Sequence, residues 1–231
     1  MTEKELPHYA RKTTDLYFCY HFGEGELCSI SDRGNYDLTS HNQHSEKKLK
    51  IKEPIPDVIE VSFGVERLML AILEDSYQKK ESTVRNKIKE REVLKLSPLL
   101  APYFVAIIPL PTSRKDEEQE KTYAQVQDKA YQLYLDLLKE VNFSITFEKT
   151  DYIGDSYHRQ DAIGTYYCLT VDTLTVNKYS PDGKPNLDYN TVTLRHRDTM
   201  KQERKLLNEI LQLLNQEYLN YYQQLIENPV K

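Results

Sequence analysis

An unbroken apolar run, YFVAIIPL at residues 103–110, constrains the fold of this chain more than any other segment. Such a run is typical of a strand buried on both faces. A long amphipathic helix over residues 116–141 and an alternating strand over residues 143–149 are expected to follow it. The later elements expected are strands over residues 165–172 and 190–197 and a last helix from about residue 199, where Thr199 and Gln202 have the spacing of a capping box. This order of elements predicts an α/β domain with a mixed sheet.

The residues ahead of this run predict a smaller set of elements. Residues 14–31 are typical of a strand hairpin, because apolar and aromatic side chains are interrupted by Gly23 and Gly25. Residues 58–62 predict a short strand that leads directly into an amphipathic helix, FGVERLMLAILEDSY. We therefore expect a few strands and one apolar-faced helix in the first part of the chain.

The boundary between the two parts is expected near residue 97. Residues 78–92, QKKESTVRNKIKERE, have almost no apolar content and are expected to be an exposed connection. The pattern changes after residues 97–102, which we expect to form a hinge. We therefore expect two domains, residues 1–97 and residues 98–231.

Composition and charge exclude several classes of protein. The net charge of −5 argues against a chain that binds nucleic acid over its whole surface, although a local basic patch is compatible with it. The cysteines Cys19, Cys28 and Cys168 form no CxxC pair, and their odd number favours a reducing compartment. No apolar run approaches the roughly 18 residues needed to span a bilayer, and the first residues are too polar for a signal peptide. We therefore expect a cytoplasmic protein with no membrane partner.

The segment VIEVSFGVERLML at residues 58–70 carries the most informative group of polar side chains. Alternation along a strand places Glu60 and Ser62 on one face, and Arg67 lies in the first turns of the helix. Gly64 allows the backbone to pass close to another group. A carboxylate, a hydroxyl and a guanidinium beside a helix N-terminus could hold a nucleotide, Mg²⁺ and a small polar substrate. Spacing alone favours the alternative, a strand packed on an amphipathic helix with a surface arginine.

A second polar group lies at residues 24–38, EGELCSISDRGNYDL. Its members are Glu26 and Ser29 on a predicted strand, followed by Asp32, Arg33 and Asp37. Glu26 and Glu60 lie on neighbouring predicted strands, so the two carboxylates could bridge through a hard cation. The alternative is an ordinary polar hairpin, which spacing alone again favours.

Several segments, in order, carry a resemblance to a known family: HYARKTTD, GEGELCSISDRGNYDL, PDVIEVSFGVERLMLAIL, LAPYFVAIIPL, IGDSYHRQDAIGTYYCLTVDT and TVTLRHRDTMKQ. Together they resemble the C-terminal half of glycyl-tRNA synthetase of the homodimeric class II type. The resemblance covers nearly the whole chain, with gaps only in the charged loops. It implies a partial class II antiparallel sheet, followed by a mixed-sheet α/β anticodon-binding domain.

The resemblance implies roles for the polar residues of the first domain. VSFGVERL would be the third class II motif, in which Arg67 contacts the phosphates of ATP as a catalytic residue. Glu60 and Glu26 would bind the Mg²⁺ that accompanies ATP, with Glu26 as a second catalytic residue. Ser62 would lie against the amino group or carboxylate of glycine, in a substrate site that also includes Gly64.

The resemblance also implies that the second domain recognises tRNA. The residues expected to contact the anticodon are Arg159, Gln160, Asp161, Arg195 and Arg197. Arginine offers paired donors to phosphates and base edges, and aspartate and glutamine can read unpaired bases. Salt bridges within the fold are the alternative role for such residues.

The sequence departs from the family pattern at a few positions. Val61 stands where the family usually has proline, which is a mild change because valine suits a strand. Asp155 and Ser156 stand where the family tends to have basic residues, and Ala162 stands where it tends to have an acid. The last three changes remove positive charge and an acceptor from the expected tRNA surface.

The implied activity is ATP-dependent attachment of glycine to its tRNA through glycyl-adenylate, catalysed by a class II glycine–tRNA ligase. The family chain carries the first and second motifs ahead of the segments quoted above. We therefore expect this chain to be inactive alone and to need a missing N-terminal half or a second subunit, within a homodimeric enzyme. The alternative is a catalytically inactive, synthetase-like accessory protein that binds tRNA through its C-terminal domain.

Overall fold

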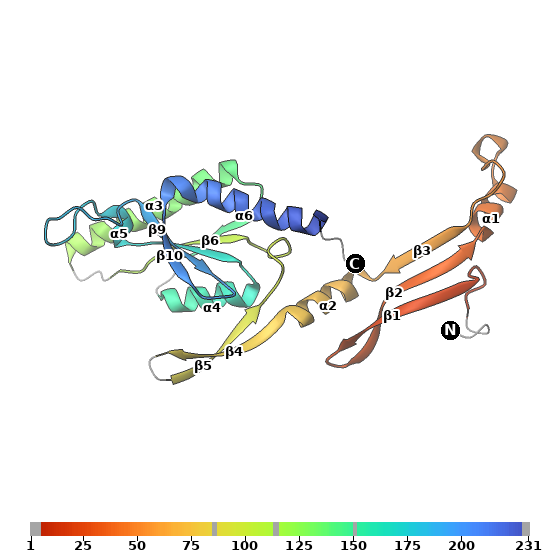
Figure 1. Ribbon diagram of the computed structural model, residues 1–231, viewed down its shortest axis with the longest axis horizontal. Coiled ribbons are helices and arrows are strands. Elements are labelled where there is room, and N and C mark those ends of the chain that lie inside the picture. The colour runs from red at the N-terminus through yellow and green to blue at the C-terminus, as the bar shows by residue number, and fades with distance from the viewer. Residues whose placement is uncertain (1–5, 85–86, 113–115, 150–151, 228–231) are drawn as a thin grey trace. The chain divides into compact units, whose positions relative to one another are not determined.

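The computed structural model describes residues 6–84, 87–112, 116–149 and 152–227 (Figure 1). The chain divides into two compact units, of which the first ends at Asp75 and the second begins at Ser76. We call them the first unit and the second unit and describe each by itself. Within the described residues, no helix combines the length and the apolar character needed to cross a membrane.

The first unit is built on a three-stranded antiparallel sheet. Its strands lie in the order β1 (Lys12–Tyr20), β2 (Gly23–Gly34) and β3 (Val58–Phe63). Helix α1 (Tyr36–His44) and a short 3₁₀ helix, η1 (Lys47–Leu49), connect β2 to β3, and helix α2 (Val65–Ser76) follows β3. The hairpin expected at residues 14–31 and the strand that leads into a helix at residue 58 are both confirmed.

The second unit begins with a hairpin that the sequence did not predict. Strands β4 (Tyr77–Val84) and β5 (Lys87–Leu94) pair antiparallel, so the exposed connection expected at residues 78–92 is wrong. At the end of β5 the side chains alternate between buried and exposed, as in a strand with one buried face. Arg91 and Val93 are buried, whereas Glu92 between them is exposed and accepts a hydrogen bond from the Tyr77 hydroxyl at 2.8 Å.

The main sheet of the second unit has five strands and mixed directions, as expected. Their order is β10 (Gln202–Leu206), β9 (Thr191–His196), β8 (Tyr167–Val171), β6 (Val105–Pro109) and β7 (Ile145–Phe147). Strand β6 is parallel to both of its neighbours, and β8, β9 and β10 pair antiparallel. All five residues of β6 and of β8 are buried, which confirms that residues 103–110 contain a central strand.

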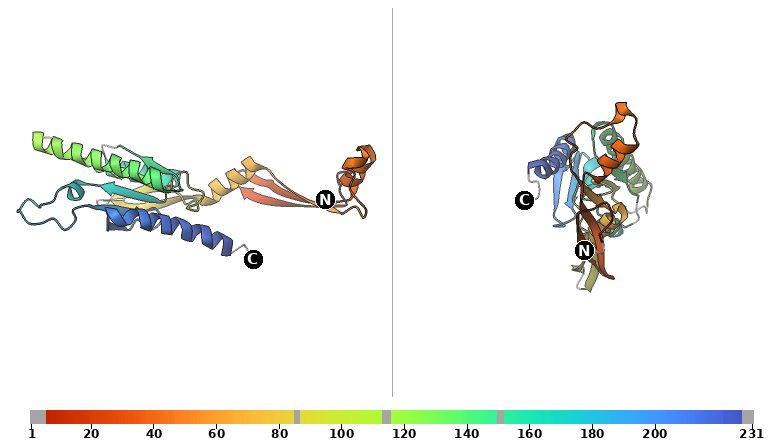
Figure 2. Two further views of the ribbon diagram at one scale, coloured as in Figure 1. Left: turned by 90° about the horizontal axis from the view of Figure 1, so that it is seen from above. Right: turned by 90° about the vertical axis from the view of Figure 1, so that its right-hand side faces the viewer.

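Helices cover both faces of this sheet. They are α3 (Glu117–Glu140), α4 (Ile153–Ile163), α5 (Thr173–Val176) and α6 (Leu207–Glu227). The larger core lies under α3 and α6, where Val126, Ala130, Ile210 and Leu214 pack on the sheet. The smaller core lies on the other face, under α4 (Figures 1 and 2).

The last helix begins later than expected. Residues 202–206 form the edge strand β10, and α6 begins at Leu207, so the capping box assigned to Thr199 and Gln202 is wrong. Met200 has a φ of 58°, which lies in the left-handed region and turns the chain from β9 back into β10. The polar residues QERK then pair with β9 at the sheet edge, where side chains can reach solvent.

A buried charge cluster fixes the hairpin to the main sheet. The carboxylate of Asp161 on α4 accepts a hydrogen bond from Arg91 Nε on β5 at 2.6 Å. It accepts two more from the guanidinium of Arg195 on β9, both at 2.9 Å. Arg91 Nη2 also donates to the main-chain oxygen of Arg197 at 2.8 Å. Each of these four side chains is 5% exposed or less.

Arg197 makes a second connection to the same segment. Its guanidinium donates to the main-chain oxygens of Leu96 and Gly164, both at 2.8 Å. Gly164 ends α4 with a φ of 87°, and a Cβ there would lie 3.0 Å from the Leu94 carbonyl, so glycine is required. The described residues 76–84 and 87–97 therefore belong to the second unit, which begins ahead of the domain boundary expected at residue 97.

Replacing Asp161 is expected to destabilise the second unit strongly. Asp161→Ala leaves Arg91 and Arg195 buried without their anionic partner, which costs about 3–5 kcal/mol. Urea unfolding followed by circular dichroism measures the loss. The control is Asp136→Ala, which removes an exposed helical ion pair with Lys139 and should cost less than about 0.5 kcal/mol. Equal effects of the two substitutions would contradict the role of Asp161.

A pair of fragments tests where the second unit begins. Residues 76–231 keep the hairpin, whereas residues 98–231 lose Arg91, Val93 and the buried Leu96. Burial of one such aliphatic side chain contributes about 1.5–3 kcal/mol, and Asp161 loses one of its two cationic partners. We expect the shorter fragment to unfold at least roughly 10 °C below the longer one, measured by differential scanning calorimetry. Coincident unfolding would show that the hairpin is not part of the unit.

Candidate functional site

One face of the three-stranded sheet is polar. The register pairs Ser31 with Glu60 and Ser29 with Ser62, so the predicted placement of Glu60 and Ser62 on one face is confirmed. The polar face, as we call it, consists of Thr13, Asp15, Ser29, Ser31, Glu60 and Ser62. Two side-chain hydrogen bonds connect β1 to β2 on this face. One joins the Thr13 and Ser31 hydroxyls at 3.2 Å, and the other runs from the Ser29 hydroxyl to the Asp15 carboxylate at 2.7 Å.

The opposite face of the same sheet is apolar. Ile59, Val61 and Phe63 alternate with the polar residues along β3, and each is more than half exposed. Val61, which replaces the proline usual in the family, pairs with Ile30 on this face. The departure at residue 61 therefore leaves the polar face unchanged.

Arg33 holds the carboxylate of Glu60. Arg33 Nη1 donates to Glu60 Oε2 at 2.5 Å, and its Nε and Nη2 donate to the two oxygens of Asp37 at 2.5 and 2.7 Å. The guanidinium carbon lies 4.0 Å from the ring centroid of Tyr9. Hydrogen bonding to Arg33 lowers the pKa of Asp37 below its ordinary value. The sequence grouped Arg33 with Asp37 but gave no sign that Arg33 contacts Glu60.

Arg67 and Glu26 lie together at the other end of the polar face. Arg67 Nη1 donates to the main-chain oxygen of Glu26 at 2.8 Å, and the buried Tyr20 donates its hydroxyl to the main-chain oxygen of Arg67 at 3.0 Å. A Cβ at Gly64 would lie 3.3 Å from Arg67 Cδ. The group that Gly64 accommodates is thus the side chain of Arg67 itself.

The acidic residues of the first unit do not form a metal site by themselves. Among the described residues, no group of three or more histidine, cysteine, aspartate or glutamate side chains lies together. Carboxylate oxygens are nonetheless suitable ligands for Mg²⁺, which usually keeps phosphate and water ligands as well. Glu26 and Glu60 lie towards opposite ends of the polar face, so the binding of Mg²⁺ by these two carboxylates stays a prediction.

Four of the five residues expected to contact the anticodon are buried. Gln160, Asp161, Arg195 and Arg197 are each 5% exposed or less. The two arginines pair with Asp161 and Asp198 and with main-chain oxygens, as described above. These four residues stabilise the fold. The charged ones, Asp161, Arg195 and Arg197, form salt bridges within the second unit, which is the alternative role considered for them above. Their burial leaves these side chains little surface for direct contact with RNA.

Arg159 is the exception among the five. Its side chain is 56% exposed and pairs with Glu148. It also donates to the hydroxyl of Ser156 at 3.2 Å, while Asp155 and Ala162 on the same helix are exposed. The departures at residues 155 and 162 therefore lie on the accessible side of α4, beside the accessible arginine.

A crevice lies beside the end of β6, where the strand order of the main sheet continues to one side of β6 and then to the other. Helix α3 leads from β6 to β7 on one side, and α4 leads back to β8 on the other side of β6. Ligands of open α/β sheets bind at such a point, outside the carboxyl ends of the strands. The crevice there has a volume of about 340 Å³ and is lined by Thr112, Asp116, Glu118, Gln119, Thr122 and Thr173. The Thr112 hydroxyl is buried and has no hydrogen-bond partner among the described residues.

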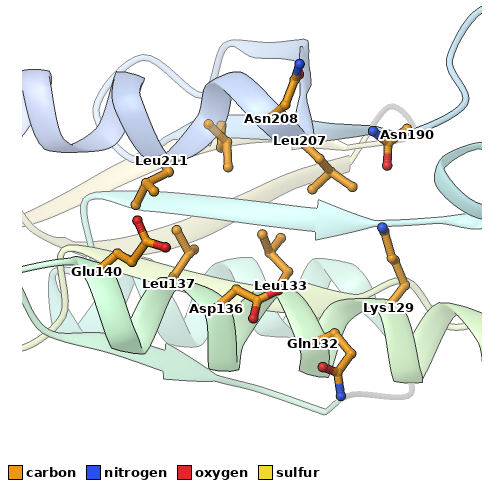
Figure 3. Close-up of a pocket in the computed structure, with 11 residues that line it drawn as sticks. Lys129, Gln132, Leu133, Asp136, Leu137, Glu140, Asn190, Leu207, Asn208 and Leu211 are labelled. Atoms are coloured by element: carbon orange, nitrogen blue, oxygen red, sulfur yellow. The ribbon is translucent and has the colours of Figure 1, made fainter.

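A second hollow lies between α3 and α6 (Figure 3). Leu133 and Leu137 point from α3 towards Leu207 and Leu211 on α6, and charged and amide side chains surround them. Its volume is about 350 Å³. The leucines extend the main core to the surface, and none of these side chains provides a nucleophile paired with a base.

A family model matches much of the second unit. Residues 105–217, from β6 into α6, match the anticodon binding domain family. The match includes the crevice, Arg159 and the buried cluster around Asp161, apart from Arg91.

Curated relatives match almost the whole chain. It is 42% identical over 218 residues to a glycine–tRNA ligase of Mycoplasmopsis synoviae, which covers 92% of this chain and 42% of that protein. It is 37% identical over 215 residues to a glycine–tRNA ligase of Alkaliphilus metalliredigens, covering 90% of this chain and 40% of that protein. The chain thus spans about two fifths of the length of these relatives.

A solved structure shares the fold. The prolyl-tRNA synthetase of Giardia lamblia, solved in complex with prolyl-adenylate, aligns with a TM-score of 0.63 and covers 95% of this chain and 41% of that one. At 16% identity the likeness concerns the fold alone. The chain is therefore related in sequence to part of the glycine–tRNA ligases, and residues 105–217 of its second unit match the anticodon binding domain family.

Proposed function

We propose that this chain is part of a class II glycine–tRNA ligase, which attaches glycine to its tRNA through glycyl-adenylate at the expense of ATP. The observation that carries the proposal is the polar face of the first unit. There Glu60 and Ser62 share one side of a sheet, and Arg67 begins the following helix beside Glu26. The sequence relationship to glycine–tRNA ligases, which includes these segments, supports the same activity.

The proposed first step is attack of the glycine carboxylate on the α-phosphorus of ATP, with release of pyrophosphate. Negative charge grows on the phosphate oxygens, and a preorganised cation stabilises it. Arg67 fits this role, because only Nη1 of its guanidinium has a partner among the described residues. Glu60 and Ser62 would bind and orient the glycine, with the carboxylate facing the ammonium group. Mg²⁺ ions bound with ATP, at Glu26 or at Glu60, would supply further charge neutralisation when present.

The second unit would contact the tRNA anticodon. Unpaired bases are recognised by hydrogen bonds to their edges, and the crevice offers hydroxyl, amide and carboxylate groups. Among them is the Thr112 hydroxyl, which has no hydrogen-bond partner within the described part of the chain. Arg159 is exposed and suits a phosphate contact. The net charge of −5 implies that such contacts are local, so affinity for bulk RNA should be low.

A chimaeric enzyme tests the proposed activity. In it, this chain replaces the matched segment of the Mycoplasmopsis synoviae ligase, and glycine-dependent ATP–pyrophosphate exchange is measured. We expect exchange in the chimaera, and a loss of about 10²–10³-fold in kcat for Arg67→Ala, because one charge-stabilising donor is removed. The isolated chain should show no exchange above background.

The control for this test is Lys52→Ala in the same chimaera. Lys52 is exposed and lies in the loop that precedes β3, so its removal should leave exchange within about twofold of the parent. A folded chimaera without glycine-dependent exchange would refute the proposed function. Unchanged exchange in Arg67→Ala would refute the role of Arg67.

Two substitutions separate base recognition from phosphate contact in the second unit. Thr112→Val removes a hydroxyl at nearly constant volume and should weaken binding of glycine tRNA by about 2–10-fold, the value of one net hydrogen bond. A control tRNA should be affected less. Arg159→Ala should weaken both tRNAs alike and flatten the salt dependence of binding.

Fluorescence anisotropy at several salt concentrations measures both effects. The control substitution is Lys139→Ala, which removes an exposed cation on α3 that pairs with Asp136. Wild-type affinity of Thr112→Val for glycine tRNA would show that the crevice does not hold an anticodon base.

A further inference from the structure

The loop that follows α5, residues 177–190, lies at the same edge of the main sheet as the crevice near Thr112 (Figure 1). Strand β8 ends at Val171, and β9, which pairs antiparallel with β8, begins at Thr191. The loop therefore emerges beside the carboxyl ends of β6 and β8, where α5 contributes Thr173 to the crevice. It is thus a neighbour of the crevice that we propose for an anticodon base.

Hydrogen bonds give this loop a defined shape. The main-chain N–H of Asn186 donates to the main-chain oxygen of Lys178 at 2.9 Å, which joins the two arms of the loop. The Asn186 side chain also donates to the main-chain oxygens of Leu174 and Asn177, at 2.8 and 2.7 Å. The loop therefore loses little conformational freedom when a ligand binds to it.

The loop exposes an aromatic ring despite this order. Tyr179 forms an isolated β-bridge with Pro185 and is 66% exposed. Successive residues of an extended arm point to opposite sides, so Tyr179 projects away from Lys178, whose ammonium lies 5.8 Å from the ring centroid of Tyr189. Among the described residues, the Tyr179 ring stacks on no other ring and pairs with no cation. The ring is thus available for stacking on a ligand.

Cations flank Tyr179 in the loop. Lys178 and Lys184 are both exposed, and Lys184 pairs with Asp182 at 3.1 Å. Within the described ranges of the chain, Lys178 makes no ion pair. Proteins that bind single-stranded RNA combine such cations, which contact phosphates, with aromatic side chains on which bases stack. The loop therefore has the chemistry to bind the face of a base, and the crevice has the hydrogen-bonding groups to bind an edge.

We propose that Tyr179 is a stacking platform for an unpaired base of the tRNA anticodon loop, next to the base that enters the crevice. Stacking uses the face of a base, so it adds affinity without selecting one base over another, whereas the crevice reads base edges. This inference rests on the proposed function, since it adds a contact to the proposed anticodon site.

Binding of the 231-residue chain to a labelled RNA stem–loop that carries the glycine anticodon tests this proposal, measured by fluorescence anisotropy. Tyr179→Ala should weaken binding about 5–100-fold, the value of one base–aromatic stack. Tyr179→Phe keeps the ring and should bind within about twofold of the parent. The salt dependence should be the same for both variants, because no charge is removed. An equal loss in Tyr179→Phe would show that the hydroxyl and not the ring carries the contact, which overturns the proposal.

A fluorescent base gives a direct signal of stacking. The adenine analogue 2-aminopurine, whose emission falls when it stacks, is placed at each unpaired position of the stem–loop in turn. At saturating protein, the parent chain should quench the emission at one position, and Tyr179→Ala should not quench it there. Equal quenching by the two proteins at every position would overturn the proposal.

Tyr222→Ala is the matched control. Tyr222 is 53% exposed on α6, outside the loop, and its replacement should leave affinity for the stem–loop unchanged. If Tyr179→Ala binds as Tyr222→Ala does, the proposal is overturned. Dimers of the parent chain in sedimentation velocity that Tyr179→Ala abolishes, with binding of the stem–loop unaltered, would assign the ring to a protein interface and also overturn it.

These measurements separate the proposal from the proposed function. ATP–pyrophosphate exchange involves no tRNA, so the chimaera tests the ligase activity independently of Tyr179. If exchange is absent and Tyr179→Ala still weakens binding of the stem–loop, the proposed activity fails and the stacking contact is supported. If the parent chain does not bind the stem–loop at low salt, or if Tyr179→Ala binds it as the parent does, the stacking proposal is overturned whatever the activity.

Discussion

The carboxylate of Asp161 is the group on which the assembly of the second unit depends. Removing an ion from water is expensive, and it is tolerated in a protein interior only when partners and hydrogen bonds compensate it. Asp161 receives hydrogen bonds from Arg91 and Arg195, and each arginine comes from a different element. A helix, a hairpin strand and a sheet strand must therefore adopt one relative arrangement, since any other would leave a charge buried and unpaired.

The first unit uses arginine differently. Arg33 lies near the surface and is shared by two carboxylates, so charge is left over on the polar face and is not cancelled as it is around Asp161. The same kind of ion pair thus stabilises packing in one unit and leaves a negatively charged polar face in the other. The difference lies in burial and in the ratio of carboxylates to guanidinium groups, both of which can be traced to named residues.

The sequence was informative where a pattern is local. The central strand β6, the long helix α3 and the common face of Glu60 and Ser62 follow from runs and alternation within a few residues. The hairpin at residues 77–94 was missed because its inward residues include a charge, Arg91, whose partner lies 70 positions away. Arg195 and Arg197 were assigned to the anticodon from the family resemblance, and the buried partner of Arg195 lies 34 positions away. Nothing near them in the sequence marks Asp161 as a buried counterion.

The candidate site shows the same division. The residues Glu26, Glu60, Ser62, Gly64 and Arg67 were found from strand alternation and from the family resemblance. The contact of Arg67 with the Glu26 carbonyl and that of Arg33 with Glu60 depend on strand pairing. The crevice near Thr112 depends on the meeting of α3 with Thr173 of α5. Such features arise only when distant segments meet.

The bond between Arg197 and the Leu96 carbonyl joins groups that are 101 positions apart. During synthesis on a ribosome, the hairpin of residues 77–94 emerges long before the strand that carries Arg195 and Arg197. Its inward side chains must therefore remain in water until most of the second unit has been translated. Contacts of such long range form slowly, because the intervening chain must first be ordered. Docking of the hairpin is thus a late event in the biogenesis of this protein, and changes at the Asp161 cluster should act mainly by speeding unfolding.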